Sequence, residues 1–221
     1  LPKLKEIVDE FSDLTFDLAM AYPCLTRSAN PEDEVFQAGL AAAKLVGRDR
    51  PHLRVVDSAR FPAAWESADQ LPAAALSLAD LAREAASQGV IFSIENSGQP
   101  IRSMALVVRQ ARAKLSPKEG SYLGLCPDPT NQLRGYPNSD PLAELEALPL
   151  DMVKLVHFKQ ATAGKAHPAL DAGDLDCARM VAVLKTKGYQ GPAIMEIPPH
   201  DQVLDNLSAS FRYFGALAGG D

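Results

Sequence analysis

Four side chains able to bind a metal ion stand at or just beyond the end of an apolar run. In chain order they are Glu95 in SIEN, Asp128 in GLCPDP, His157 in LVHFK and Glu196 in IMEIP. Two Glu, one Asp and one His form a mixed oxygen and nitrogen set. Such a set suits Mn²⁺, Mg²⁺, Co²⁺ or Zn²⁺ with coordination positions left open for a substrate. We therefore expect these residues to hold one divalent cation.

Each of these residues, taken singly, also has a structural explanation. A polar residue that closes a strand is often a helix cap or a loop contact. Glu95 and Glu196 differ, because they sit in the apolar runs VIFSIE and AIMEI, where burial without a partner is costly. A cation removes that cost. Because the feature recurs on successive runs, the pattern favours a metal site over a series of independent caps.

The elements that must position these residues are short apolar runs that alternate with longer helical stretches. This alternation is typical of repeated β-α units and a parallel sheet. The predicted strands are 14–22, 52–58, 90–95, 122–126, 153–158 and 193–197, and the predicted helices are 1–11, 31–46 (with Asn30 as N-cap), 68–88, 101–115, 140–148, 174–187 and 203–217. An open doubly wound sheet and a barrel are both consistent with this alternation of strands and helices. The gathering of metal-competent residues at strand ends favours the barrel, whose active sites lie at that face.

From about Leu14 to the end, the chain resembles the xylose-isomerase-like (β/α)8 TIM barrel superfamily, in particular its sugar epimerase and sugar-phosphate isomerase branch. In that family one metal is held by Glu, Asp, His and Glu from four consecutive strands. The intervals here are 33, 29 and 39 residues (95 to 128, 128 to 157, 157 to 196), each fitting one βα unit. The segment LDAGDLDCARMVAVLKTKGYQGPAIMEI is the most specific match, since it resembles the unit that leads into the last ligand.

The resemblance implies proton transfer next to the carbonyl of a ketose or related sugar, whether phosphorylated or not. The cation would act as a Lewis acid that stabilises an enediolate. Glu95 and Glu196 would be the catalytic pair that removes and returns the proton. Return to the same carbon gives epimerisation and return to the adjacent carbon gives isomerisation, and the sequence leaves both open.

Further residues are expected to bind the substrate. In IENSG, Asn96 resembles the residue that follows the family's first ligand. Asn131 stands where relatives often carry a His, and it can donate a hydrogen bond but cannot take up a proton. Lys159, Lys165 and His167 occupy a loop where relatives often carry an Arg or Asp. A Lys there is suited to a phosphate or carboxylate on the substrate.

The front of the chain departs from the family pattern. An eight-stranded barrel needs two strands before Leu14, and this segment predicts only a helix. The chain also begins at Leu1 rather than Met. We expect residues 1–221 to form a single (β/α) barrel domain that lacks its first β-α-β piece.

Composition narrows the class of protein. Of 221 residues, 47% are hydrophobic, enough for a sizeable core, and the formal net charge of −6 argues against a general nucleic-acid binder. Cys24, Cys126 and Cys177 are widely separated, which is typical of reduced thiols in a cytoplasmic protein. No apolar run approaches the ~20 residues of a membrane span. We expect a cytoplasmic enzyme with a small-molecule sugar substrate, without nucleic-acid or membrane partners. The resemblance also implies that the protein forms a homodimer or homotetramer.

Two alternatives stay open: a barrel that has lost catalysis and acts as a binding module, and an apurinic-endonuclease-type metal phosphodiesterase. The latter needs more His and acidic ligands and a basic DNA-facing surface.

The remaining His, Cys and aromatic residues have structural explanations. His52 and His200 are expected at the surface, and Cys126 as a small buried hydrophobe. Phe61 and Trp65 would either cover a sugar face or pack as a loop on the barrel rim.

Overall fold

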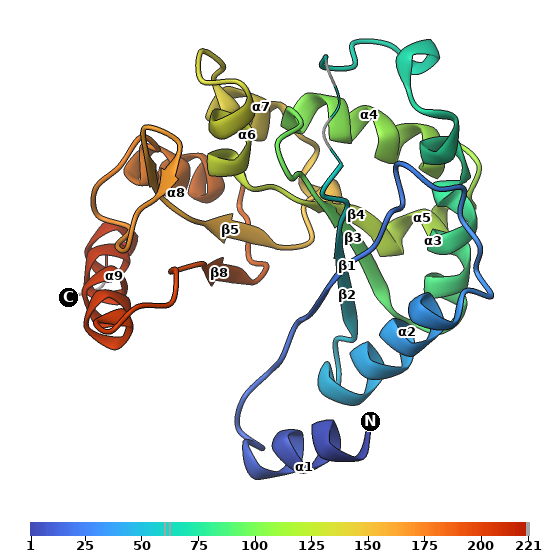
Figure 1. Ribbon diagram of the computed structural model, residues 1–221, viewed down its shortest axis with the longest axis horizontal. Helices are drawn as coiled ribbons and strands as arrows, with labels where there is room; N and C mark the ends of the chain where they lie inside the picture. Colours follow the sequence, from blue (N-terminus) through green and yellow to red (C-terminus); the bar gives the residue numbers. More distant parts are fainter. Residues whose placement is uncertain (60, 62, 220–221) are drawn as a thin grey trace.

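The computed structural model describes residues 1–59, 61 and 63–219, and its centre is a parallel sheet (Figure 1). Its strands, in spatial order, are β1 (Leu18–Ala21), β2 (His52–Val56), β3 (Ile91–Glu95) and β4 (Leu123–Cys126). In the register, Val56 lies beside Glu95 and Glu95 beside Cys126. The carboxyl ends of these strands therefore meet at one edge of the sheet.

Two further strands continue the order beyond β4. β5 (Val156–Phe158) pairs in parallel with β8 (Ala193–Met195). The segment before β5 joins β4 through a parallel bridge between Leu125 and Val153, and His157 N donates to Pro127 O at 3.1 Å. Among the residues described, no pairing closes β8 onto β1. The molecule is thus an open, partial (β/α) barrel.

Helices follow the strands and cover the outer face of the sheet. They are α1 (Pro2–Glu10), α2 (Glu34–Val46), α3 (Leu78–Ser87), α4 (Ile101–Arg112), α5 (Pro117–Tyr122), α6 (Pro129–Gly135), α7 (Pro141–Ala147), α8 (Cys177–Thr186) and α9 (Val203–Ala218), with 3-10 turns at Ala68–Gln70, Ala73–Ser77 and Leu150–Met152. The core forms where these helices meet the strands: Phe36 of α2 packs edge-on against Phe92 of β3, with ring centroids 5.7 Å apart. No helix in the described part of the chain is long and apolar enough to cross a membrane.

The predicted fold class is confirmed, with local corrections. The first strand begins at Leu18 rather than residue 14, because only four of its residues pair with β2. The predicted helix 68–88 is interrupted at Pro72, which has no N–H to continue a helix. Asp33, not Asn30, caps α2: its carboxylate accepts hydrogen bonds from the first-turn N–H groups of Val35 and Phe36. The short α5, α6 and the hairpin of β6 (Ala161–Thr162) and β7 (Lys165–Ala166) were not predicted.

Candidate metal centre

The structure brings the four predicted ligands together at the carboxyl ends of the strands. Glu95 ends β3, and Asp128 follows β4 as the N-cap of α6. His157 lies within β5, and Glu196 follows β8. One donor atom from each lies within 4.8 Å of the others. The cluster therefore draws on the four-stranded sheet and on the β5–β8 pair.

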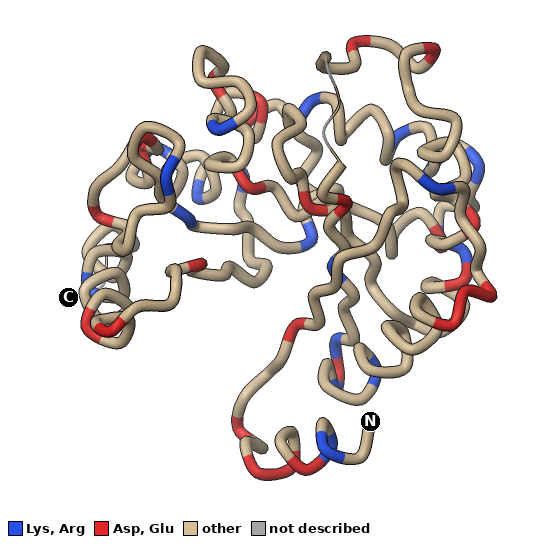
Figure 2. Tube along the Cα trace, viewed as in Figure 1, with Lys and Arg blue, Asp and Glu red and all other residues tan. Residues whose placement is uncertain are grey.

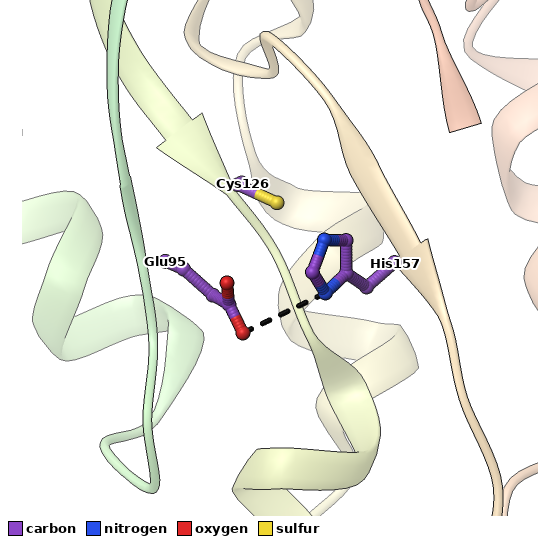
Figure 3. Close-up of side chains that lie close together, drawn as sticks. All are labelled: Glu95, Cys126 and His157. Atoms are coloured by element: carbon purple, nitrogen blue, oxygen red, sulfur yellow. Dashed lines mark ion pairs between the residues drawn. The ribbon is translucent and has the colours of Figure 1, made fainter. Parts of the chain in front are cut away.

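The imidazole of His157 is at the centre of this cluster. Its Nδ1 lies 3.6 Å from Glu95 Oε1, 3.6 Å from Asp128 Oδ2 and 3.2 Å from Glu196 Oε2. Figure 3 shows Glu95 and His157 reaching toward each other from β3 and β5. Glu95, Asp128 and His157 are buried, whereas the Glu196 side chain is 44% exposed. The cluster is therefore closed on the barrel side and open at Glu196.

Several buried donor atoms in the cluster have no hydrogen-bond partner among the described residues. They are Asp128 Oδ2 and both ring nitrogens of His157. Leaving such atoms unpaired is costly inside a protein. A divalent cation would satisfy the carboxylate oxygens and one imidazole nitrogen together, so the donor set fits a metal ion.

The electrostatics of the cluster favour a positive charge at its centre. Burial lowers the pKa of His157, but the neighbouring Asp128, Cys126 and Glu196 side chains outweigh it and raise this pKa to about 12. The imidazole of His157, 3.2 Å away, lowers the pKa of Glu196 to about 2, and Lys159 adds to the effect. Burial raises the pKa of Glu95. The carboxylates thus stabilise a cation, whether an imidazolium or a metal ion.

Asn96 and Asn131 hold the ligands in place. The Asn96 carboxamide bonds twice to the backbone of Asp128, accepting from its N–H at 2.8 Å and donating to its C=O at 2.8 Å. Asn131 Nδ2 donates to Glu95 Oε1 at 3.2 Å. The Asn131 N–H donates to Asp128 Oδ1 at 2.8 Å, which leaves Asp128 Oδ2 for the cluster.

The three predicted residues of the loop after β5 lie in different surroundings. Lys159 Nζ lies 2.7 Å from Glu196 Oε1 and 3.7 Å from Asp128 Oδ2, so Lys159 belongs to the site. Lys165 is exposed on β7, and His167 Nδ1 lies 2.9 Å from Ala169 O. The structure does not bring Lys165 or His167 into contact with the cluster, and their roles stay predictions.

Sequence reasoning missed one residue at the site and misjudged the place of another. The guanidinium of Arg54 pairs with Glu95 and, through Nε at 3.3 Å, with Asp17 Oδ2. A charge inside the apolar run HLRVV, the same signal that identified Glu95, would have found it. Cys126 is fully buried as predicted, but its sulfur lies against Glu95 and His157 (Figure 3). Burial raises the pKa of this thiol to about 11.

The predictions for the remaining histidines and for the two aromatic residues have different outcomes. His52 was wrongly placed at the surface: it is 2% exposed, with Nε2 2.8 Å from Ser93 Oγ and Nδ1 2.8 Å from Asp17 Oδ1. His200 is half-buried before α9. Trp65 packs in the core, as the loop-packing alternative predicted, whereas Phe61 packs against it and also lines a cavity.

That cavity of about 460 Å³ adjoins the metal cluster and shares Asn131 with it. Its wall includes Phe61, Ser97, Gln99, Asn131, Arg134 and Tyr136. A cavity of this size suits a small organic ligand. The arrangement combines a cluster of metal-competent side chains with a neighbouring cavity, at the face where barrel enzymes act.

A family model described as "Xylose isomerase-like TIM barrel" matches residues 4–214. The chain belongs to the xylose isomerase-like TIM barrel family. No curated protein matches this barrel.

Several solved structures are similar to this xylose isomerase-like barrel. An IOLI protein with a bound zinc atom has a TM-score of 0.69 at 13% identity, over 97% of this chain and 81% of that chain. A probable 3-DHS dehydratase from Bacillus anthracis has a TM-score of 0.69 at 13% identity, over 96% and 81%. A D-allulose 3-epimerase from Methylomonas sp., in complex with D-allulose, has a TM-score of 0.65 at 18% identity, over 92% and 72%. These likenesses show the fold.

Proposed function

We propose that this barrel is a divalent-metal-dependent isomerase or epimerase of a ketose or related sugar. The observation that carries the proposal is the cluster of Glu95, Asp128, His157 and Glu196 beside a cavity at the carboxyl ends of the strands. In barrel enzymes this face holds the active site. The similarity to a D-allulose 3-epimerase with its sugar bound supports a sugar as the substrate.

The four ligands would hold Mn²⁺, Mg²⁺, Co²⁺ or Zn²⁺. When bound, the cation supplies a Lewis acid that polarises a carbonyl and stabilises the negative charge left when a proton leaves the adjacent carbon. The buried unpaired oxygen of Asp128 and the ring nitrogens of His157 support this assignment. Glu95 and Glu196 complete the set from the two sheets.

The chain's own residues would carry the proton. Glu95 and Glu196 come from different sheets, so each can remove a proton from a bound sugar or return one, as general base and general acid. Arg54 and Asn131 fix the carboxylate of Glu95. Lys159 pairs with Glu196 and is placed to donate to a substrate oxygen.

The two alternatives receive less support. Lys and Arg positions are scattered among Asp and Glu along the described trace (Figure 2), and the formal net charge is −6. A protein that grips the DNA backbone needs a basic face. A binding module needs no cluster of buried, unpaired metal donors.

Metal content tests the site. We expect about one equivalent of Mn, Mg, Co or Zn per chain after loading and gel filtration, measured by element-resolved mass spectrometry. Glu196→Ala should lose most of it. Glu146→Ala removes the same charge from the exposed face of α7 and should retain the metal. Equal metal in both variants, or none in the wild type, would contradict the proposed ligand set.

Solvent exchange tests the reaction. The loaded wild type should transfer deuterium from D₂O into a carbon-bound position of at least one ketose in a panel, followed by NMR. Glu95→Gln should slow that exchange about 100-fold or more, since general acid-base groups contribute about 10²–10⁴ in rate. Nicking of abasic DNA instead would favour the endonuclease reading. A loaded protein that does neither would favour the binding module.

A further inference from the structure

Arg134 is a charged residue of the cavity wall that the proposed reaction does not use. It lies in the last turn of α6, is exposed, and lines both the 460 Å³ cavity and a neighbouring one of about 530 Å³. Within residues 1–59, 61 and 63–219, no carboxylate lies within 4.0 Å of its guanidinium; Asp174 lines the neighbouring cavity but does not pair with it. An unpaired guanidinium beside a cavity is suited to a carboxylate or phosphate, which it can bind with two parallel hydrogen bonds.

Gln99 supplies a second, independent observation on the same wall. Its side chain is 5% exposed, and Oε1 has no hydrogen-bond partner in the described part of the chain. A buried carboxamide oxygen without a donor is uncommon. Because this oxygen accepts hydrogen bonds, the ligand that satisfies it must bring an O–H or N–H group, as a sugar does.

The spacing within α6 sets where these groups lie relative to the metal cluster. Asp128 caps the start of the helix, and Arg134 stands six residues later. At about 1.5 Å per residue, their Cα atoms are about 9 Å apart along the helix axis. Asn131 lies between them and touches both the cluster and the cavity. This spacing puts the Arg134 side chain within reach of the far end of a monosaccharide whose carbonyl lies at the cluster.

The wall between these groups is backbone rather than side chain. Gly98 and Gly135 both line the cavity, and a Cβ added to Gly135 would lie 2.5 Å from the Gly98 carbonyl oxygen. Gly98 has a φ of +135°, which side-chain-bearing residues rarely adopt. Gly135 thus lets the two backbone segments approach closely, so that backbone forms this part of the cavity wall.

We infer that Gln99 and Arg134 form a subsite for the far end of the substrate, which is a sugar carrying an oxyanion. This inference rests on the proposed function for taking the ligand to be the substrate. A terminal phosphate and a carboxylate share the chemistry that Arg134 recognises.

Calorimetric titration of the Mg²⁺-loaded full chain tests the inference with three probes: D-ribulose, D-ribulose 5-phosphate and 5-keto-D-gluconate. The wild type should bind at least one anionic probe about 10-fold to 100-fold more tightly than D-ribulose, the range expected for charge-assisted hydrogen bonds. Arg134→Gln should weaken the binding of that anionic probe to about the level of D-ribulose, so that the preference is lost. Arg109→Gln removes an equal charge from the exposed face of α4 and should keep the preference. A gain with the phosphate alone identifies a sugar phosphate, and a gain with the carboxylate alone a sugar acid.

Inorganic phosphate, titrated into the metal-free protein, separates this inference from the proposed reaction. Binding by the wild type and Arg109→Gln that weakens about 10-fold or more in Arg134→Gln supports the subsite even where no ketose exchanges deuterium. Equal phosphate binding by all three proteins, or none by the wild type, overturns the subsite. Deuterium exchange into a neutral ketose by the loaded wild type would then leave the proposed reaction standing.

Discussion

Arg54 links the metal cluster to the lower part of the barrel. Its side chain is 13% exposed and pairs with Glu95 toward the cluster and with Asp17 on the other side. Asp17 in turn lies 2.8 Å from His52 Nδ1. The orientation of a proposed metal ligand therefore depends on a buried chain of charges that extends away from the site.

Replacing Arg54 should be far more costly than replacing an exposed arginine. Arg54→Met leaves the buried carboxylate of Glu95 without its cationic partner and takes one of two partners from Asp17, and we expect a loss of roughly 3 kcal/mol in the free energy of unfolding. Arg179→Met breaks the exposed pair with Asp140, where each side chain is at least 44% exposed, and should change the free energy of unfolding little. Urea denaturation of the metal-free proteins measures both. A small loss for Arg54→Met would show that its ion pairs do not hold the site.

Asp17 should make the stability depend on pH on the acid side. Burial raises its pKa, but the hydrogen bond and charge of His52, together with Arg54, lower it below its ordinary value of 3.8. A depressed pKa contributes stability that is present above 3.8 and is lost as the pH falls through the folded-state pKa. Asp17→Asn should therefore be less stable than the wild type at pH 6, and the difference should shrink below pH 4. Exposed Asp13→Asn is the control, and urea unfolding at each pH gives the values. A difference that stays constant with pH would contradict this assignment.

At the same scale, sequence reasoning identified the four side chains that cluster in the structure, but not the residues that support them. A charge inside an apolar strand is visible in the sequence for Glu95 and for Arg54 alike. Their pairing is not visible, because it depends on the register that sets Val56 beside Glu95 and so brings Arg54 within reach. His52 was misplaced for the same reason: its partners Ser93 and Asp17 lie on other segments.

The contact between β4 and the segment before β5 places His157 opposite Glu95. Gly124 in β4 allows this contact, since a Cβ there would lie 2.4 Å from the backbone oxygen of Met152 and 2.5 Å from Lys154 Cγ. The close approach of the two segments thus depends on the missing side chain at Gly124.

Gly124→Ala should force β4 away from the next segment. We expect a loss of about 1–3 kcal/mol in the free energy of unfolding, the usual cost of overpacking, together with weaker metal binding. Gly120→Ala is the matched control: its Cβ would meet Arg112 Cγ at an ordinary 3.6 Å within α5, so it should be neutral or slightly stabilising. Thermal unfolding and metal titration measure both effects. Equal stability of the two variants would show that the strands separate without strain.

At the scale of elements, the sequence predicted those strands and helices whose residue patterns are long enough to recognise. All six predicted strands are present because continuous apolar runs between helices identify buried parallel strands. The two-residue strands β6 and β7 and the short helices α5 and α6 carry too few residues to show a period. Pro72 was a local signal that the length of the apolar pattern around it concealed.

At the scale of the whole molecule, the proposed metal would add a further link between the four-stranded sheet and the β5–β8 pair, which already meet through the Leu125–Val153 bridge and the hydrogen bond from His157 N to Pro127 O. Glu95 and Asp128 belong to the four-stranded sheet, and His157 and Glu196 belong to the β5–β8 side. A ligand that binds the folded state stabilises it by mass action, about 2.7 kcal/mol at a concentration of 100 times Kd.

Metal should therefore raise the melting temperature. For a chain of this size we expect an increase of about 5–10 °C at saturating Mn²⁺, from about 2–4 °C per kcal/mol. Glu196→Ala should show little increase, whereas Glu146→Ala should respond as the wild type does. Differential scanning calorimetry with and without chelator measures the shift. An unchanged melting temperature in the wild type would mean that the ion does not join the two sheets.

The uneven burial of the four ligands bears on how an ion enters and leaves. Glu95, Asp128 and His157 are fixed in the interior, whereas Glu196 stands on the exposed segment after β8. Swinging one half-exposed carboxylate aside opens the coordination sphere without disturbing the core. Ion exchange should then proceed much faster than unfolding, so the protein would take up whichever divalent ion its surroundings supply, and the growth medium would decide which metal a purified sample carries.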